Sequence, residues 1–394
     1  MKVIFVHEVS WFKKVVFEMH DFPELLSLRG HEVHFLDFDE GKARTKRRVL
    51  TTIETRAHVG SRVSVATPPR ILPGILGRLL ATIVQPLAFL WLIRRIRPDV
   101  VVVYSVPTSG WQITRICRFK KIPIVARVID VSHVLRETRF KLFVKWAEKF
   151  VFTNANFVST HNEALRQYCI GLGASSAKSS VIYPGSDTQR FYPAPPRSNL
   201  QLKLGIQPHD KVIVFMGTLF RFSGLVELLN ELAPELRKDR SLIFLILGDG
   251  EEFDRLQQLV RSLEMGNQVL LTGRIEYEQL ADYIRLGQVA VVPFHPELVT
   301  HGALPGKVLQ YLACGLPTIA TPLHGLQSMV AEGEGVLYAD SSRDMADKAV
   351  QLVNNSQHRD QVAIRGLDLI NQHCNWETQI QKFELLLESL VSDR

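Results

Sequence analysis

The sequence predicts an α/β protein made of two Rossmann-like, doubly wound domains that face a central cleft. Three observations lead to this fold class. The chain has 394 residues, more than one ordinary core needs. Its 46% apolar and 22% charged residues match an average soluble globular protein. Finally, short unbroken apolar runs alternate with helical segments, as in parallel sheets covered on both faces.

In the N-terminal half these runs predict a first sheet. The expected strands are Val3–His7, Glu32–Leu36, Val100–Tyr104, Ile124–Val128, Phe157–Thr160 and Val181–Tyr183. Ligands of doubly wound sheets bind at the carboxyl ends of the strands, so the predicted cleft is also the predicted active site.

The C-terminal half repeats this plan. Its expected strands are Val212–Met216, Leu242–Leu247, Gln268–Leu271, Val289–Pro293, Thr318–Ala320 and Gly335–Leu337. Residues 188–210 are rich in proline and poor in periodic apolar positions, which is the composition of a linker. The predicted domains are therefore 1–190 and 191–394, with the last helix a candidate to pack back on the first domain.

One apolar segment, Leu79–Ile93, has two interpretations. It is shorter than a membrane span and contains Gln85 and Pro86 near its centre. Its position before Val100–Tyr104 favours a buried crossover helix, whereas its basic flanks also suit a helix lying at a membrane interface.

Charge divides unevenly along the chain. Residues 1–200 carry a net charge of +15 and residues 201–394 a net charge of −8. The basic half is expected to face an anionic partner such as a membrane surface or a phosphorylated lipid, although basic solvation alone would look the same. No nucleic-acid-binding motif accompanies the charge, so we expect no nucleic-acid partner.

The four cysteines, Cys117, Cys169, Cys314 and Cys374, are widely spaced. They predict neither a zinc site nor a disulfide framework, and they favour a reducing compartment. We expect a cytoplasmic protein, with the inner face of the membrane as its second possible location.

The stretch from Thr300 to Thr321 carries the strongest chemical signal. A Gly- and Pro-rich loop leads into a helix that starts near Pro305, and Gly315 ends that helix. Helix N-termini attract phosphate, and Lys307 in the first turn adds a full positive charge. Lys307 and Gln310 share one helix face and can reach the same ligand. The plain alternative is a solvated helix lysine.

This stretch resembles the retaining glycosyltransferases of family 4, which have the GT-B fold. Three further segments match the family: Gly30-His31-Glu32-Val33, Val181–Asp187 and Leu247–Gly250. The resemblance implies an acceptor-binding N-terminal domain and a nucleotide-sugar-binding C-terminal domain. It also implies that a hydroxyl acceptor, a glycan or a lipid-linked one, attacks a nucleoside-diphosphate sugar with retention of configuration.

Two family glutamates correspond here to Gly302 and Gln310. An amide at 310 can still bind ribose hydroxyls. Gly302 offers only its backbone, so a role of the first glutamate is lost or moves to Glu297 or His301. The resemblance implies that the remaining loop residues, Ala303, Leu304 and Pro305, also line the donor site.

A second departure removes two positive charges from the turn after Val212–Met216. The family places Arg and Lys where this chain has Thr218 and Ser223. Arg221 and Lys307 are the candidates to stabilise the diphosphate instead, because the leaving group develops charge whichever residues meet it. Backbone groups of the strand-end segments are expected to hold the nucleotide; these are Gly217, Gly248 and Gly273-Arg274-Ile275.

In the N-terminal domain the family often has a His-Asp pair after the strand predicted at Ile124–Val128. This chain keeps Asp130, and His133 follows three residues later. Ser10–Glu18, with its aromatic and lysine residues, is a candidate acceptor loop or a loop packed on the sheet. We expect no obligatory metal or cofactor and, as in the front-face mechanism of such enzymes, no protein nucleophile. A catalytically inactive nucleotide-sugar-binding relative is the main alternative.

Overall fold

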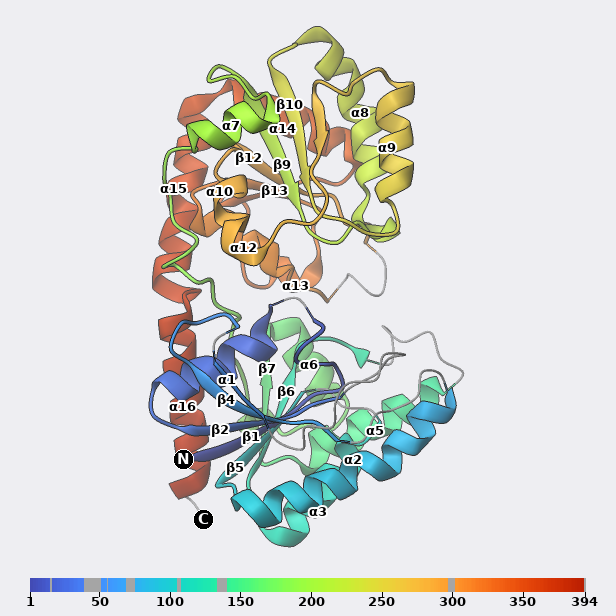
Figure 1. Cartoon of the computed structure of the whole chain (residues 1–394), viewed down its shortest axis with the longest axis vertical. Coiled ribbons are helices and arrows are strands. Elements are labelled where there is room, and N and C mark those ends of the chain that lie inside the picture. The colour runs from blue at the N-terminus through green and yellow to red at the C-terminus, as the bar shows by residue number, and fades with distance from the viewer. Residues whose placement is uncertain are drawn as a thin grey trace. The chain divides into compact units, whose positions relative to one another are not determined.

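The computed structural model describes residues 1–14, 16–38, 51–54, 56–68, 75–104, 108–132, 140–296 and 302–392 (Figure 1). The chain divides into two compact units. Unit 1 comprises Met1–Tyr183 and Gln379–Arg394, and unit 2 comprises Pro184–Thr378.

Unit 1 contains an eight-stranded sheet in the order β3-β4-β2-β1-β5-β6-β7-β8. Every neighbouring pair is parallel except the edge pair β3 and β4. The strands are β1 (Lys2–Val6), β2 (Glu32–Leu36), β3 (Thr51–Glu54), β4 (Arg62–Ala66), β5 (Val100–Tyr104), β6 (Ile124–Val128), β7 (Phe157–Thr160) and β8 (Ser179–Val181).

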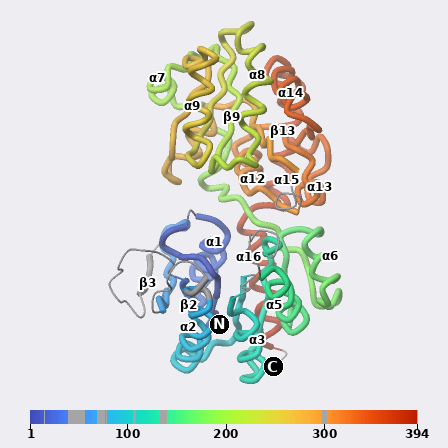
Figure 2. The backbone as a smooth tube through the Cα atoms, turned by 90° about the vertical axis from the view of Figure 1, so that its right-hand side faces the viewer, coloured from blue at the N-terminus to red at the C-terminus, as the bar shows by residue number. Residues whose placement is uncertain are grey.

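Helices cover both faces of this sheet (Figures 1 and 2). On one face lie α1 (Glu18–Leu28) and α16 (Trp376–Ser392), where Phe383 of α16 packs against Phe5 and Phe22. On the other lie α2 (Ile75–Ile96), α3 (Gly110–Lys120), α5 (Lys141–Asn154) and α6 (Glu163–Gly171). A short 3₁₀ turn, η1 (Ser176–Lys178), precedes β8.

Helix α2 combines the two interpretations of its sequence. The side of α2 that faces the sheet is buried, as expected of a crossover helix. Phe89, Leu92 and Ile96 on this side belong to the core between the helix and the sheet. The Gln85 side chain is also buried and donates a hydrogen bond of 3.2 Å to the carbonyl of Asp37. Yet Leu79–Ile96 is long and apolar enough to cross a membrane, and only 33% of that stretch is buried. The outer side of α2 is therefore apolar and exposed.

Unit 2 contains a six-stranded, wholly parallel sheet in the order β11-β10-β9-β12-β13-β14. Its strands are β9 (Lys211–Met216), β10 (Leu242–Leu247), β11 (Val269–Leu271), β12 (Val289–Val292), β13 (Thr318–Ala320) and β14 (Val336–Tyr338). Its α-helices are α7 (Ser198–Leu204), α8 (Leu225–Lys238), α9 (Phe253–Ser262), α10 (Leu280–Ile284), α12 (Gly306–Ala313), α13 (His324–Gln327), α14 (Ser342–Asn354) and α15 (Ser356–His373), and the 3₁₀ turns are η2 (Arg221–Ser223) and η3 (Tyr277–Gln279).

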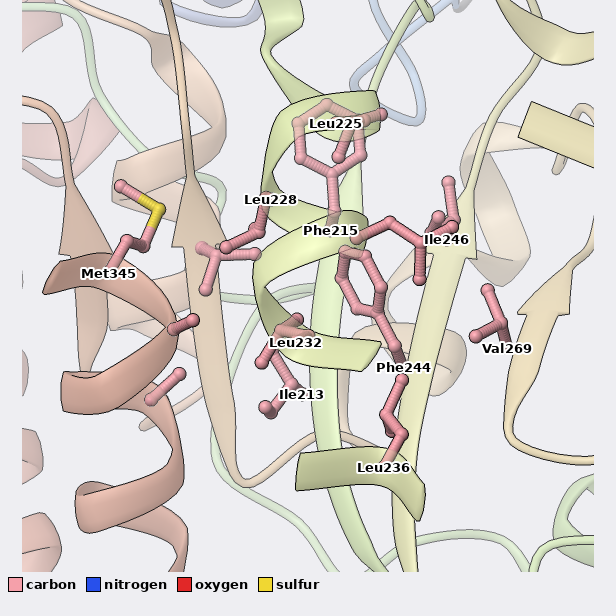
Figure 3. Close-up of a cluster of buried hydrophobic side chains, with 14 of the residues drawn as sticks. Ile213, Phe215, Leu225, Leu228, Leu232, Leu236, Phe244, Ile246, Val269 and Met345 are labelled. Atoms are coloured by element: carbon pink, nitrogen blue, oxygen red, sulfur yellow. The ribbon is translucent and has the colours of Figure 1, made fainter. Parts of the chain in front are cut away.

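The core of unit 2 lies between the sheet and helices α8, α9 and α14 (Figure 3). Phe215 of β9 and Phe244 of β10 point from the sheet towards α8, where Leu228 and Leu232 meet them. Every other residue of a strand faces the same side, so one alternate set of apolar residues builds this core.

The predicted fold class is confirmed in its two doubly wound parallel sheets. All twelve predicted strands are present, with ends shifted by at most two residues. The strands β3 and β4 were missed. The edge strand β3 (Thr-Thr-Ile-Glu) is short and mostly polar, and its neighbour β4 (Arg-Val-Ser-Val-Ala) alternates polar and apolar residues. Unbroken apolar runs mark only the central strands.

The division between the units falls between Tyr183 and Pro184, whereas the sequence placed it near residue 190. The start of the Pro-rich segment 188–210 packs on unit 2 and is not a free linker. The Arg285 guanidinium donates to the carbonyls of Arg190 and Tyr192, both at 2.8 Å, and lies over the Tyr192 ring.

Candidate functional site

Three glycines follow the neighbouring strands β9, β10 and β11 of unit 2 and hold the carboxyl ends of these strands close together. Gly217 follows β9, Gly248 follows β10 and Gly273 lies beyond β11, all with positive φ. A Cβ on Gly248 would lie 1.9 Å from the carbonyl oxygen of Gly217, so no larger residue fits. The Gly248 amide donates to the Gly273 carbonyl at 3.0 Å. The structure thus brings these three predicted site residues together.

The turn after β9 is closed by the Ser223 side chain. Its hydroxyl accepts a hydrogen bond from the Phe220 amide (3.2 Å) and donates one to the Thr218 carbonyl (3.3 Å). Ser223 is fully buried, so it shapes the turn and does not face a ligand. Thr218 and Arg221 are exposed beside it, and the Arg221 amide donates to Glu251 at 2.9 Å.

Lys307 lies at the start of α12, against the end of β9. Its Nζ is 4.2 Å from the ring centre of Phe215 and 4.7 Å from that of Phe294. A Cβ on Gly217 would lie 2.4 Å from this Nζ. Burial lowers the pKa of Lys307 to about 7, because its ammonium loses water and no carboxylate of the described residues pairs with it.

At the start of α12 the amides of Gly306 and Lys307 have no acceptor among the described residues, whereas the Val308 amide donates to the Pro305 carbonyl at 2.9 Å. The first amides of a helix have no acceptor within the helix, and no side chain caps α12 at Pro305. Together with Lys307 and the turn at Gly217, this region has the character of an anion-binding site.

Further residues of α12 fix this geometry. The Tyr311 hydroxyl accepts a hydrogen bond of 2.6 Å from the Met216 amide, which ties α12 to the end of β9. Gln310 is half-buried three residues after Lys307, so the predicted pair shares a helix face.

The loop before α12 packs on α13. A Cβ on Gly325 would lie 2.3 Å from the Gly302 carbonyl oxygen and 2.5 Å from that of Ala303. Leu304 and Pro305 are buried. Glu297 and His301 lie outside the described residues, and so does the predicted His133 of unit 1.

Beyond β11, Arg274 is exposed and Ile275 is half-buried. They follow Gly273 and therefore lie at the same edge of the sheet as Gly217 and Gly248, where the sequence predicted the base to bind.

In unit 1 the candidate residue Asp130 follows β6 and is half-buried. Its carboxylate accepts a hydrogen bond of 3.1 Å from the Ser132 hydroxyl. The Ser132 amide in turn donates to the buried carboxylate of Glu148 at 2.9 Å. Asp130 is thus held at the carboxyl edge of the sheet by the turn that follows it.

Sequence reasoning missed a buried charge cluster at this edge. The carboxylate of Glu18 pairs with the Arg127 guanidinium through two hydrogen bonds, 2.7 and 2.8 Å, and also meets His161. Burial alone would raise the pKa of Glu18, but the charges of Arg127 and His161 outweigh it and lower the pKa to about 2. The signal was Arg127 itself, a charge inside the apolar run Ile-Val-Ala-Arg-Val that requires a buried partner.

The candidate acceptor loop proves to be packed on the sheet. Trp11 is fully buried against Phe35, with ring centres 4.7 Å apart. The Arg56 guanidinium donates to the carbonyls of Trp11, Phe12 and Lys14. Among the described residues of the loop, Phe12, Lys13 and Lys14 face solvent.

Among the described residues, one group has the spacing of metal ligands. His31, Glu384 and Glu388 place ligand atoms within 4.8 Å of one another. Glu384 already binds Arg29 and His31, each at 2.6 Å, so its charge is compensated by the protein.

Family models match most of the chain. The model described as Glycosyltransferase Family 4 matches residues 19–190, and the model described as Glycosyl transferases group 1 matches residues 210–355. The chain belongs to the family 4, group 1 glycosyltransferases. This confirms the family resemblance of the sequence motifs.

Sequence relatives cover parts of the chain. An uncharacterized glycosyltransferase of Methanocaldococcus jannaschii is 23% identical over 70% of this chain and 70% of its own length. A D-inositol 3-phosphate glycosyltransferase of Kineococcus radiotolerans is 31% identical over 49% of this chain. That match spans 48% of the Kineococcus enzyme, so the chain matches about half the length of such relatives.

Solved glycosyltransferases share the whole fold. Sucrose-phosphate synthase from Thermosynechococcus elongatus has a TM-score of 0.80 at 17% identity, with both chains covered completely. The Anabaena protein HepE, in complex with UDP-glucose, has a TM-score of 0.75 at 16% identity and covers 99% of this chain. The GT-B fold predicted for this family member is therefore confirmed.

Proposed function

We propose that this glycosyltransferase uses a nucleoside-diphosphate sugar as donor and transfers the sugar, with retention of configuration, to a hydroxyl acceptor. The observation that carries the proposal is the position of Lys307. Its ammonium lies between the turn at Gly217 and the uncapped first turn of α12, and no described carboxylate pairs with it. A diphosphate is the ligand that fits this arrangement of one cation and free backbone amides.

The chemistry follows from charge. When the sugar leaves, negative charge develops on the diphosphate, and preorganised donors in a partly dry site stabilise it strongly. Lys307 supplies the positive charge, and the first amides of α12 supply donors. Arg221 lies in the turn after β9 and contributes a second cation once a ligand is present.

The acceptor hydroxyl must lose its proton as the bond to the sugar forms. In the proposed front-face reaction the departing phosphate oxygen accepts that proton, so the chain's own task is to orient the two substrates. Asp130 of unit 1 is proposed to bind the acceptor substrate. The cluster of Glu18, Arg127 and His161 positions the neighbouring strand ends.

A donor panel tests this function. The purified chain is incubated with UDP-, GDP- and ADP-sugars, and slow donor hydrolysis and thermal stabilisation are measured. UDP-glucose comes first, because HepE binds it in a structure of the same fold. We expect one nucleotide class to be hydrolysed, and Lys307→Met to abolish that hydrolysis, whereas Lys203→Met on α7 leaves it unchanged.

The anomeric configuration of the first-formed product, read by proton magnetic resonance, tests retention. An inverted product would contradict the mechanism while leaving the donor assignment intact. Nucleotide binding with no turnover of any donor would instead favour the catalytically inactive alternative. The observation that favours this inactive alternative is that the buried Ser223 replaces a lysine of the family.

A further inference from the structure

Exposed apolar side chains are concentrated on three helices of unit 1. Ten of the eighteen large apolar residues that are exposed in the described structure belong to α2, α3 and α5 or directly precede α5. They are Leu79, Leu80, Ile83, Leu87, Trp91, Phe119, Phe140, Leu142, Phe143 and Trp146. We call the outer surface of these helices the α2/α3/α5 face. Concentration of this kind marks an interaction surface.

The three helices form one continuous layer on the same side of the sheet (Figures 1 and 2). The Gln112 side chain of α3 donates a hydrogen bond of 2.8 Å to the Thr82 carbonyl of α2. Next to it, Trp111 packs edge-on against Trp146 of α5, with ring centres 5.4 Å apart. The aromatic cluster continues on α5 through Phe143 and Phe150. The exposed residues of α2 and α5 therefore flank α3 on a fixed scaffold.

The exposed charges of this face have a single sign. Helices α2 and α3 contain no Asp or Glu along their whole length. In α5 the acid is Glu148, which is 3% exposed and bonded to Ser132 and Tyr168. Exposed basic residues lie on all three helices: Arg94, Arg95, Arg115, Arg118, Lys120, Lys141, Lys145 and Lys149.

We propose that the α2/α3/α5 face docks on an anionic lipid bilayer. Tryptophan, phenylalanine and leucine side chains insert at the level of the lipid headgroups, and lysine and arginine extend along them to lipid phosphates. The Arg95 guanidinium, 5.6 Å above the Trp91 ring, shows this combination within one helix turn. A second copy of the chain fits poorly, since a two-fold pairing of this face would bring together eight cations from each copy, sixteen in all, with no exposed acid on the three described helices to separate them.

The geometry links this surface to the substrate edge of unit 1. In a parallel sheet, crossover helices run back against the strands. Helix α2 connects the parallel strands β4 and β5, and α5 connects β6 and β7, so both helices begin near the carboxyl edge. Leu79 and Leu80 lie near the start of α2, and Leu142 lies near the start of α5. Ligands of such sheets bind at that edge. A lipid-carried hydroxyl is therefore the expected acceptor, an extension that rests on the proposed function.

Vesicle sedimentation of the full chain tests the docking. We expect binding to vesicles of phosphatidylcholine with phosphatidylglycerol, release by high salt, and no binding to phosphatidylcholine alone. Each basic residue near an anionic surface contributes about fivefold to partitioning, so Lys141→Gln, Lys145→Gln and Lys149→Gln together should weaken it about a hundredfold. Leu142→Ser should weaken it at least about tenfold, because the leucine no longer enters the lipid.

Matched changes on α7 of unit 2 serve as controls. Leu202 is 78% exposed and Lys203 is exposed beside it, so Leu202→Ser and Lys203→Gln should leave vesicle binding unchanged. Circular dichroism and donor hydrolysis without lipid check that every variant is folded and active, which separates failure of docking from failure of the proposed function. Absence of vesicle binding, equal binding to both vesicle types, or binding that the α5 variants do not weaken would overturn the proposal. So would a dimer in lipid-free solution that the same variants dissolve.

Discussion

The two units use the carboxyl edges of similar parallel sheets in different ways. In unit 2 that edge is made of glycines, Gly217, Gly248 and Gly273, and of a helix start with one lysine. In unit 1 it is made of ionisable side chains such as Asp130 and His161, anchored by Glu18. Contacts made by backbone groups suit a part of the ligand that is the same for every donor, such as a diphosphate. Side chains suit a ligand that differs from one family member to the next.

Removal of the charge that anchors unit 1 should have the largest effect. Glu18→Gln leaves the Arg127 guanidinium buried without a counter-charge, which typically costs about 3–5 kcal/mol. Hydrogen exchange should show accelerated opening of unit 1, while the strands of unit 2 keep their protection. Equal loss of protection in both units would show that their stabilities are not separate.

The glycine edge of unit 2 should be nearly as sensitive to one methyl group. Gly248→Ala places a Cβ 1.9 Å from the Gly217 oxygen at positive φ, and we expect about 3 kcal/mol of destabilisation together with loss of donor binding. Gly30→Ala is the control: its φ is also positive, but nothing lies within 4 Å, so about 1 kcal/mol is expected. Thermal unfolding compares the two, and similar losses would refute close packing at Gly248.

Lys307→Ala should weaken binding of a nucleoside diphosphate about ten- to a hundredfold, the usual range for a hydrogen bond to a charged group. Binding of the nucleoside alone should not change, because the proposed contact of the lysine is to phosphate. Calorimetric titration with both ligands measures the difference. If the two losses are equal, the lysine does not contact the diphosphate.

The same lysine predicts a pH dependence. Its pKa is about 7 without ligand, and an adjacent diphosphate raises it, so binding takes up a proton. Affinity for a nucleoside-diphosphate sugar should be greatest below pH 7 and fall up to about tenfold per pH unit above it. Lys307→Met should flatten this profile. An unchanged profile in that variant would assign the titration to another group.

Gln310→Ala should have the smallest effect, about 1 kcal/mol, on the nucleoside part of the ligand, as expected for one neutral hydrogen bond to ribose. Gln310→Glu, which restores the family residue, should retain activity. A larger loss with the diphosphate than with the nucleoside would move Gln310 from the ribose to the phosphates.

Local sequence predicted the central strands and the start of α12, because buried parallel strands and helix starts have short-range patterns. It did not predict the antiparallel pair of β3, which is short and mostly polar, and β4, which alternates polar and apolar residues, or the pairing of Glu18 with Arg127 across 109 residues. The role of Ser223 was also hidden, since a serine that closes its own turn has no distinctive spacing. Charge totals indicated a basic half, but only the structure separates the buried inner side of α2 from its exposed outer side.

The return of the last helix to unit 1 affects the order in which the chain can fold during synthesis. Phe383 of α16 covers Phe5 and Phe22, yet the 195 residues of unit 2 are translated between them. At about 5–20 residues per second, the ribosome needs roughly 10–40 seconds for that interval. Throughout it, the part of the first sheet that α16 covers stays exposed beside α1, and unit 2 can complete its own core only once α14 has been made. Chaperone dependence in the cell should therefore fall on unit 1.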